Sequence, residues 1–368
     1  MRTFDPCTRV VYMVPWNLGP YHAARYAELH RQLPGLALVR VGMTEVHRPW
    51  SAQLPTDLPV YDLPISSSQK LGQISSAYRL LNRLAPRLVL VVGYVDSTCV
   101  FGALWSRLHG APPVLVSDST ALDHPRHRVK ESAKRALVSG LFTAAFVAGR
   151  RSAEYVADLG IKPGYIWRGV DVVDNDHFAV AAEVNSRVAP SFLAVTRLSP
   201  EKDLPTLIEA FRLYRDAGGS WDLRIAGTGP QETELRNAVS PNLIAHVHWL
   251  GWVSYEDLPG CYHSSNCLVL PSVSEPWGLV VNEAMAAGLP VLVSERCGCV
   301  PELCHEGVNG FAFNPGDAPR LADLMLAVAS DRNRAREMGE ASRRIIASFS
   351  IEASARAVVE CVSTLLTS

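Results

Sequence analysis

The chain has 368 residues, enough for two domains of ordinary size rather than one. Its 48% hydrophobic and 19% charged residues describe an ordinary globular protein, and its net charge of −1 excludes a simple nucleic-acid binder. The charge is uneven: residues 1–178 hold 20 Lys and Arg against 14 Asp and Glu, and residues 179–368 hold 15 against 22. This split fits an anionic partner for the first half and fits solvated surface charge equally well.

The start of the chain has no apolar signal-peptide core, and no run of uncharged residues is long enough to cross a membrane. We therefore expect a cytoplasmic protein, at most peripheral to the inner face of the membrane, with reduced cysteines. Cys297, Cys299, Cys304 and His305 lie close together. Their spacing lacks the separated pairs of a zinc site and favours free thiols.

Apolar β-rich runs alternate with helical patterns in the first half of the chain. The runs are residues 9–14, 88–93, 113–117 and 144–148. Continuous apolar runs are typical of strands buried on both faces of a parallel sheet, and the alternation predicts a doubly wound α/β domain. Residues 170–190 break the pattern and are interpreted as an interdomain linker.

The same alternation restarts after the linker. Strands are predicted at 192–196, 222–226, 267–270 and 290–293, helices at 204–214 and between the last two strands, and a final helix from residue 351. We expect two Rossmann-like domains, 1–180 and 181–348, with helix 349–368 at the end. The carboxyl ends of the strands are the expected ligand-binding edges, facing a cleft.

The segment after Leu270 carries the strongest functional signal. A loop leads to a helix that is predicted to begin near Trp277 or Gly278, and a helix N-terminus of this kind can bind an anion. Glu275 lies just before it and Glu283 about two turns inside it. Two acids beside an anion site fit a ligand that also carries sugar hydroxyls, since carboxylates accept hydrogen bonds. The alternative is a helix-dipole partner and a solvated helix residue.

The segment Glu275–Val291 resembles the E-x7-E signature of the GT4-type retaining glycosyltransferases of GT-B fold. Three further segments resemble, in order, the family's R-x4-K donor segment, donor loop and base-contact segment. They are residues 197–204, 226–230 and 250–253. Residues 298–302 resemble its GG-x-PE turn, with Cys299 in place of the second glycine. The ordered set covers residues 190–318.

The resemblance implies a role for each matching position. Arg197 and Lys202 would neutralise the leaving diphosphate, Glu275 would bind the donor sugar, and Glu283 would bind the ribose. Surface charge is the alternative for the two cations. The remaining donor-binding positions are backbone or pocket residues: Gly19, Gly227, Gly229, Gly251, Trp252, Val253, Gly278, Leu279 and Val280. The resemblance also implies that the final helix crosses back to the first domain.

The first half matches the family less closely. Gly19 resembles one glycine of an N-terminal loop, but Pro20 follows it where the family has a second glycine. The family's histidine after the fourth strand is absent, and Tyr94 and Asp118 are the residues we would test in its place, with Asp118 a catalytic candidate. Asp118 could equally be a turn or N-cap residue. His22 is a further acceptor-side candidate, although a lone histidine in a first helical turn is more often structural.

Residues 124–135 are rich in Arg, Lys and His and, as a helix, would present a basic face. Such a face suits peripheral membrane contact or an anionic acceptor, and a solvated helix is the alternative. Asp174 and Asp176 form a D-x-D pattern that holds a metal in another glycosyltransferase fold. Here the pair falls in the linker, so we interpret it as a turn and expect no metal and no cofactor.

The expected function is transfer of a hexosyl-type sugar from a UDP- or GDP-sugar to a carbohydrate, glycolipid or small-molecule hydroxyl, with retention, as in polysaccharide or glycolipid synthesis. Closure of the cleft would exclude water. A nucleotide-sugar epimerase, a sugar phosphorylase and a non-catalytic nucleotide-sugar-binding subunit are the alternatives. The phosphorylase would need a pyridoxal-binding lysine, and Lys202 is the only lysine after Lys162.

Overall fold

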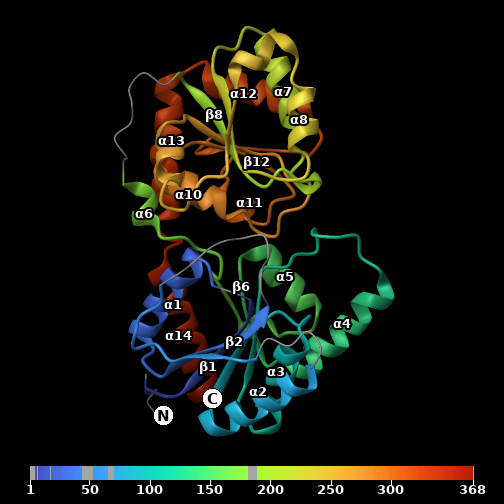
Figure 1. Cartoon of the computed structure of the whole chain (residues 1–368), viewed down its shortest axis with the longest axis vertical. Helices are drawn as coiled ribbons and strands as arrows, with labels where there is room; N and C mark the ends of the chain where they lie inside the picture. Colours follow the sequence, from blue (N-terminus) through green and yellow to red (C-terminus); the bar gives the residue numbers. More distant parts are fainter. Residues whose placement is uncertain are drawn as a thin grey trace. The chain divides into compact units, whose positions relative to one another are not determined.

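The computed structural model describes residues 5, 7–16, 18–43, 53–64, 70–180 and 189–367. These residues form two compact units. Unit 1 comprises residues 1–121, 125–172 and 351–368, and unit 2 comprises residues 122–124 and 173–350. Both units are α/β with parallel sheets, as the alternation of apolar runs and helical patterns predicted (Figure 1). Residues 181–188, at the predicted domain boundary, lie outside the described residues.

Unit 1 is built around a parallel sheet in the order β3-β2-β1-β4-β5-β6-β7. Its strands are β1 (Val10–Trp16), β2 (Leu36–Met43), β3 (Val60–Asp62), β4 (Leu88–Val92), β5 (Pro113–Ser117), β6 (Ala144–Val147) and β7 (Ile166–Arg168). Its helices are α1 (Pro20–Gln32), α2 (Lys70–Leu84), α3 (Ser97–Leu108), α4 (Arg128–Leu141), α5 (Arg150–Asp158), the short 3-10 helix Pro163–Tyr165 and α14 (Ile351–Thr367). The last helix, α14, packs beside α1 (Figure 1).

Unit 2 has the sheet order β10-β9-β8-β11-β12-β13, also parallel. Its strands are β8 (Ser191–Val195), β9 (Asp222–Ala226), β10 (Val247–Gly251), β11 (Cys267–Leu270), β12 (Val291–Ser294) and β13 (Gly310–Phe313). Its helices are α6 (Asn175–Ala179), α7 (Leu204–Asp216), α8 (Glu232–Ala238), α9 (Leu258–His263), α10 (Leu279–Ala287), α11 (Val300–Leu303), α12 (Ala318–Ala329) and α13 (Arg332–Ile346), with 3-10 helices Pro200–Lys202 and Pro241–His246.

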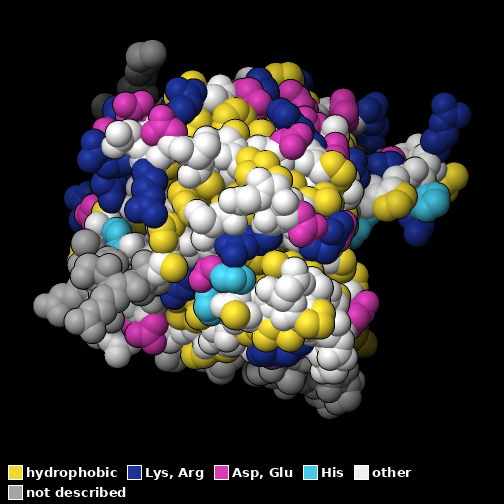
Figure 2. Space-filling view, turned by 90° about the horizontal axis from the view of Figure 1, so that it is seen from above, with side chains coloured by type: hydrophobic (Ala, Val, Ile, Leu, Met, Phe, Trp, Pro, Cys, Tyr) yellow, Lys and Arg dark blue, Asp and Glu magenta, His cyan; other side chains and the backbone are white. Residues whose placement is uncertain are grey.

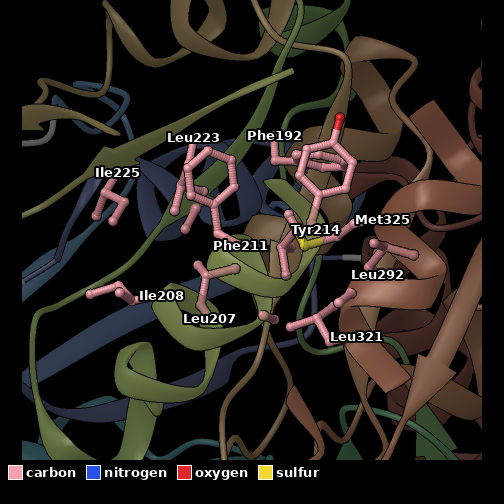
Figure 3. Close-up of a cluster of buried hydrophobic side chains, with 14 of the residues drawn as sticks. Phe192, Leu207, Ile208, Phe211, Tyr214, Leu223, Ile225, Leu292, Leu321 and Met325 are labelled. Atoms are coloured by element: carbon pink, nitrogen blue, oxygen red, sulfur yellow. The ribbon is translucent and has the colours of Figure 1, made fainter. Parts of the chain in front are cut away.

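The core of unit 2 lies where α7 and α12 cover one face of the sheet. Phe192 of β8 and Phe211 and Tyr214 of α7 are fully buried, and their rings meet edge to face or stacked (Figure 3). The Tyr214 hydroxyl oxygen accepts a hydrogen bond of 2.9 Å from the backbone N–H of Trp221. This bond satisfies the one polar atom that the tyrosine brings into the core. Packing of the helices against this face supports the sheet and thereby positions the carboxyl ends of its strands.

Three segments differ from the sequence-based expectations. The basic segment is helical only from Arg128, and residues 124–127 precede the helix. The linker 170–190 contains a helix, α6, which packs against α9 and α10 of unit 2. Helix α10 begins at Leu279, slightly later than predicted, because Gly278 has a left-handed conformation with φ of 107° that cannot continue a helix.

Truncation of the core should lower the stability of unit 2. Phe211→Ala removes a ring with no exposed surface, and the cavity should cost about 3–5 kcal/mol in the free energy of unfolding. The measurement is denaturant-induced unfolding followed by circular dichroism. The matched control is Val308→Ala, at a side chain that is 54% exposed, where we expect a change within about 0.5 kcal/mol. Equal losses from the two variants would contradict this description of the core.

Candidate functional site

The sequence-predicted donor residues of unit 2 follow the carboxyl ends of its strands. Strands β8 and β11 are neighbours in the sheet, although β9 and β10 come between them in the chain. The order of the sheet therefore reverses between β8 and β11, and loops diverge there to leave room for a ligand. Arg197 and Lys202 follow β8, and Glu275 follows β11. The reversal brings these three residues to one place.

Lys202 and Glu275 form an ion pair across this reversal point. The ammonium of Lys202 donates a hydrogen bond to Oε2 of Glu275, and the two side chains are only 19% and 16% exposed. A second link joins the same loops, since the backbone N–H of Val273 donates to the carbonyl of Glu201 at 2.9 Å. The β8 and β11 loops thus act as one structure, with a cation and a carboxylate at its centre.

Arg197 adds a second cation near Lys202. Its side chain is exposed to solvent, whereas Glu201 beside it accepts a hydrogen bond of 2.5 Å from the Ser199 hydroxyl. This bond, reinforced by the charges of Lys202 and Arg197, lowers the pKa of Glu201. The Glu201 carboxylate therefore stays ionised beside the two cations.

Two glycines allow the β8 and β9 loops to touch. A Cβ on Gly227 would lie 1.8 Å from the carbonyl oxygen of Thr196, and one on Gly229 would lie 2.3 Å from that of Leu198. The backbone N–H of Gly227 also donates to the carbonyl of Gly251 at 2.6 Å. No other residue type fits at these two positions without moving the loop that carries Arg197 and Lys202.

The N-terminus of α10 lies on the β11 side of the reversal point. Its N-cap, Gly278, supplies no side-chain hydrogen bond, and the first turn contains no acid. The N–H groups of Leu279 and Val280 have no acceptor within the described parts of the chain. Two free donors at the positive end of a helix dipole suit a phosphate or a sugar oxygen.

The loop that carries Glu275 is supported from behind by residues 297–299. The N–H of Gly298 donates to the carbonyl of Glu275 at 2.9 Å, and that of Cys299 donates to Trp277 at 3.1 Å. A Cβ on Gly298 would lie 1.7 Å from the carbonyl oxygen of Pro276. Burial raises the pKa of Cys299, so its thiol stays neutral behind the loop. The described residues contain no group of three or more side chains that could hold a metal ion.

Glu283 has a different partner from Glu275. Its side chain is 1% exposed, and Oε2 accepts a hydrogen bond of 2.5 Å from the hydroxyl of Tyr262 on α9. Phe178 of α6 packs its ring edge to face against Tyr262 at 5.9 Å. The two acids of the E-x7-E segment are therefore held separately, one at the loop and one within the packing of α6, α9 and α10.

The predicted base-contact segment, residues 250–253, begins in the last two residues of β10. Gly251 has a left-handed conformation with φ of 67°, and it turns the chain out of the strand. Trp252 is then 55% exposed, and Val253 is partly buried. A large ring with half its surface exposed can stack on a flat partner such as a nucleobase.

The acceptor-side candidates lie at the carboxyl edge of the other sheet, in unit 1. Gly19 and His22 follow β1, Tyr94 follows β4, and these two strands flank the reversal point of that sheet. Nδ1 of His22 accepts a hydrogen bond of 3.2 Å from the N–H of Gly19, so the ring has a structural role at the start of α1. Asp118 follows β5 and is exposed.

Tyr94 belongs to a polar network that the sequence did not indicate. Tyr155 of α5 donates to Glu131 at 2.9 Å and accepts from Arg126 at 2.8 Å. Burial and the neighbouring Tyr155 raise the pKa of Tyr94 to about 12. Burial and the hydrogen bond to Glu131 raise the pKa of Tyr155 to about 12. Both phenols stay protonated, and Tyr155 donates its proton to Glu131. The sequence holds no local signal for this network because its members come from two helices and two loops that are separate in the chain.

The D-x-D pair takes part in helix capping. Asp174 is the N-cap of α6, and its carboxylate accepts from the N–H groups of Asp176 and His177 at 3.1 and 3.2 Å. The carboxylate thus has a structural function that accounts for its position.

The chain is similar in sequence to known glycosyltransferases. Residues 182–345 match the family model described as Glycosyl transferases group 1. The amylovoran biosynthesis glycosyltransferase AmsK of Erwinia amylovora is 33% identical over 144 residues, which are 37% of this chain and 35% of that protein. A GDP-mannose-dependent alpha-(1-6)-phosphatidylinositol monomannoside mannosyltransferase of Mycobacterium tuberculosis is 28% identical over 257 residues, 65% and 66% of the two chains. The chain thus spans less than two thirds of either relative's length.

Solved structures share the whole fold at low sequence identity. HepE of Anabaena, in complex with UDP, has a TM-score of 0.78 at 16% identity, covering 97% of this chain and 100% of that one. Sucrose-phosphate synthase of Thermosynechococcus elongatus has a TM-score of 0.77 at 18% identity, covering 98% and 99%. The fold is that of the GT-B glycosyltransferases, as the resemblance implied.

The support behind the Glu275 loop can be tested by adding one methyl group. Gly298→Ala places a Cβ against the Pro276 carbonyl, so the loop must shift, at a cost of roughly 1–3 kcal/mol in the free energy of unfolding. The control is Gly164→Ala, where a Cβ would meet no atom within 4 Å and stability should change by less than about 0.5 kcal/mol. Chemical denaturation compares the two. A Gly298→Ala protein as stable as wild type would show that the loop is not packed as described.

Proposed function

We propose that the protein, whose residues 182–345 match the family model of the group 1 glycosyl transferases, moves a sugar from a nucleoside-diphosphate sugar to an acceptor hydroxyl with retention of anomeric configuration. The observation that carries the proposal is the Lys202–Glu275 ion pair at the reversal point of the unit 2 sheet, beside the uncapped start of α10. This arrangement offers cations and N–H donors for a diphosphate and a carboxylate for a sugar.

The diphosphate would bind to Lys202, Arg197 and the N–H groups that begin α10. Cleavage of the bond between the anomeric carbon and the phosphate oxygen leaves negative charge on the nucleoside diphosphate. Cations fixed where that charge develops lower the barrier, because they need no reorganisation during the reaction. The acceptor oxygen would then bond to the anomeric carbon, and its proton would pass to the departing phosphate oxygen.

Glu275 would accept hydrogen bonds from the donor sugar's hydroxyls. Its carboxylate is paired with Lys202, so it would lie next to the proposed diphosphate site, where the donor sugar would be attached. Positive charge develops on the sugar ring in the transition state, and a nearby carboxylate also stabilises it. Glu283 would hold the ribose hydroxyls, exchanging its hydrogen bond with Tyr262 for them. Gly251–Val253 would line the base site, where Trp252 offers a stacking surface.

The donor would carry UDP or GDP, and the acceptor would bind through unit 1. HepE was solved with UDP, and the mycobacterial relative is GDP-mannose-dependent. AmsK acts in amylovoran biosynthesis, and the mycobacterial relative acts on a phosphatidylinositol mannoside, which supports a polysaccharide or glycolipid acceptor. Tyr94, Asp118 and His22 are the proposed acceptor-side residues.

Replacement of Glu275 separates catalysis from nucleotide binding. Glu275→Ala should lower kcat by at least about 100-fold, since it removes a charge that acts on the transition state. The affinity for the nucleoside diphosphate should not fall, because Glu275 would bind the sugar and not the nucleotide. The assay is release of nucleoside diphosphate in the presence of acceptor, paired with calorimetric titration. Glu256→Ala, at an exposed acid after β10, is the control. Near-wild-type turnover by Glu275→Ala would refute the assignment.

Transfer should not depend on a divalent metal. The proposed diphosphate site uses Lys202, Arg197 and helix N–H groups in the place where other enzymes use a metal ion. Activity measured after dialysis against EDTA should stay within about two-fold of the untreated enzyme, and added Mg²⁺ should change it little. Complete loss of activity in EDTA that Mg²⁺ restores would refute this part of the proposal.

A further inference from the structure

Helix α4 has an unusual distribution of buried residues. In its 14 residues only Val138 and Leu141, both near the end, are buried. The first ten residues are all exposed except Glu131 and Lys134, which are partly buried. Figure 1 shows α4 standing at the edge of unit 1, and no described helix is long and apolar enough to cross a membrane. The start of α4 is therefore held to unit 1 along one side only.

The inward side of α4 is satisfied by its own contacts. Lys134 donates to Glu131 at 2.8 Å, Glu131 accepts from Tyr155 at 2.9 Å, and Arg126 donates to the same tyrosine. Burial opposes ionisation of Glu131, but the hydrogen bonds from Lys134 and Tyr155 outweigh it and lower its pKa. These residues of the basic segment therefore serve the fold.

The outward cations of α4 have no such partner. Arg128, Lys130 and Arg135 are exposed, and each lacks a side-chain hydrogen bond or ion pair to any described residue. Arg128 and Lys130 lie in the first turn, where the positive end of the helix dipole disfavours cations. Neither the stability of the helix nor the packing of unit 1 explains them.

An apolar strip lies between these cations. At 3.6 residues per turn, Val129, Ala133 and Ala136 point away from the buried Val138, with Arg128 and Arg135 on one side and Lys130 on the other. Val129 is 83% exposed, and Leu137 beside Lys130 is 38% exposed. In Figure 2, Lys, Arg, His and hydrophobic side chains gather together on the projecting segment that contains α4.

We propose that the outer face of α4 is a docking surface for an anionic lipid membrane, with the helix lying in the plane of the interface. The cations on the two sides of the apolar strip would attract anionic headgroups. The strip between them can enter the boundary between headgroups and acyl chains. A free phosphate or a nucleic acid would use the cations but would leave Val129 and Leu137 in water. The pairing of charge with exposed apolar surface therefore favours the lipid.

Vesicle co-sedimentation of the full chain tests the proposal. The wild-type protein should bind vesicles of phosphatidylcholine mixed with phosphatidylglycerol, and bind pure phosphatidylcholine vesicles far less. The triple variant Arg128→Gln, Lys130→Gln, Arg135→Gln should bind the anionic vesicles about 100-fold more weakly. Salt at about 1 M, where charges are screened beyond roughly 3 Å, should release the wild-type protein.

Two controls distinguish binding through the outer face of α4 from binding through any exposed charged or apolar residue. Arg320→Gln, Arg332→Gln, Arg344→Gln removes three exposed arginines from unit 2 and should bind anionic vesicles as wild type does. Val129→Asp should weaken binding at least about ten-fold, whereas Val308→Asp, at another exposed valine, should not. The proposal would be overturned if the wild-type protein did not bind anionic vesicles. It would also be overturned if the α4 triple variant and the unit 2 triple variant lost binding equally. Unchanged binding by Val129→Asp would overturn it as well. None of these outcomes bears on the transfer reaction.

Discussion

The ion pair between Lys202 and Glu275 is the contact on which the candidate site depends. It joins residues 73 positions apart, and it can form only because the sheet order places β8 beside β11. Gly227 and Gly229 let the β8 loop lie against the β9 loop, and Gly298 lets residues 297–299 support the loop of Glu275. Since both side chains are mostly buried, loss of one partner would leave a poorly solvated charge. The pair therefore joins the two loops and holds a cation and a carboxylate side by side.

Much of this arrangement could be predicted from the sequence, for a physical reason. Strands that are buried on both faces are continuous apolar runs, so the residue at which each strand ends can be recognised in the sequence. The predicted strands 222–226 and 267–270 match β9 and β11. In a parallel sheet the residues after those ends share one edge. Arg197, Lys202 and Glu275 follow such ends, and a resemblance that covered only residues 190–318 was enough to group them.

The sequence did not reveal features that depend on which side of a helix faces the core. Glu283 is buried and hydrogen-bonded to Tyr262 because α6, α9 and α10 pack together, and no local pattern marks that packing. The basic segment 124–135 divides into inward and outward cations only once α4 is known to begin at Arg128. The Tyr94 and Tyr155 network joins elements that are far apart in the chain.

In the proposed site, the diphosphate would compete with the Glu275 carboxylate for Lys202. Calorimetric titration of UDP and GDP into three proteins tests it most directly: wild type, Lys202→Met and Glu275→Gln. For the nucleotide that binds, the two substitutions should change the affinity in different ways. Lys202→Met should weaken binding at least about ten-fold, because a cation that contacts phosphate is lost, and Glu275→Gln should bind as tightly as wild type or tighter, because the ammonium is released. Equal weakening by both substitutions, or no change in either, would contradict it.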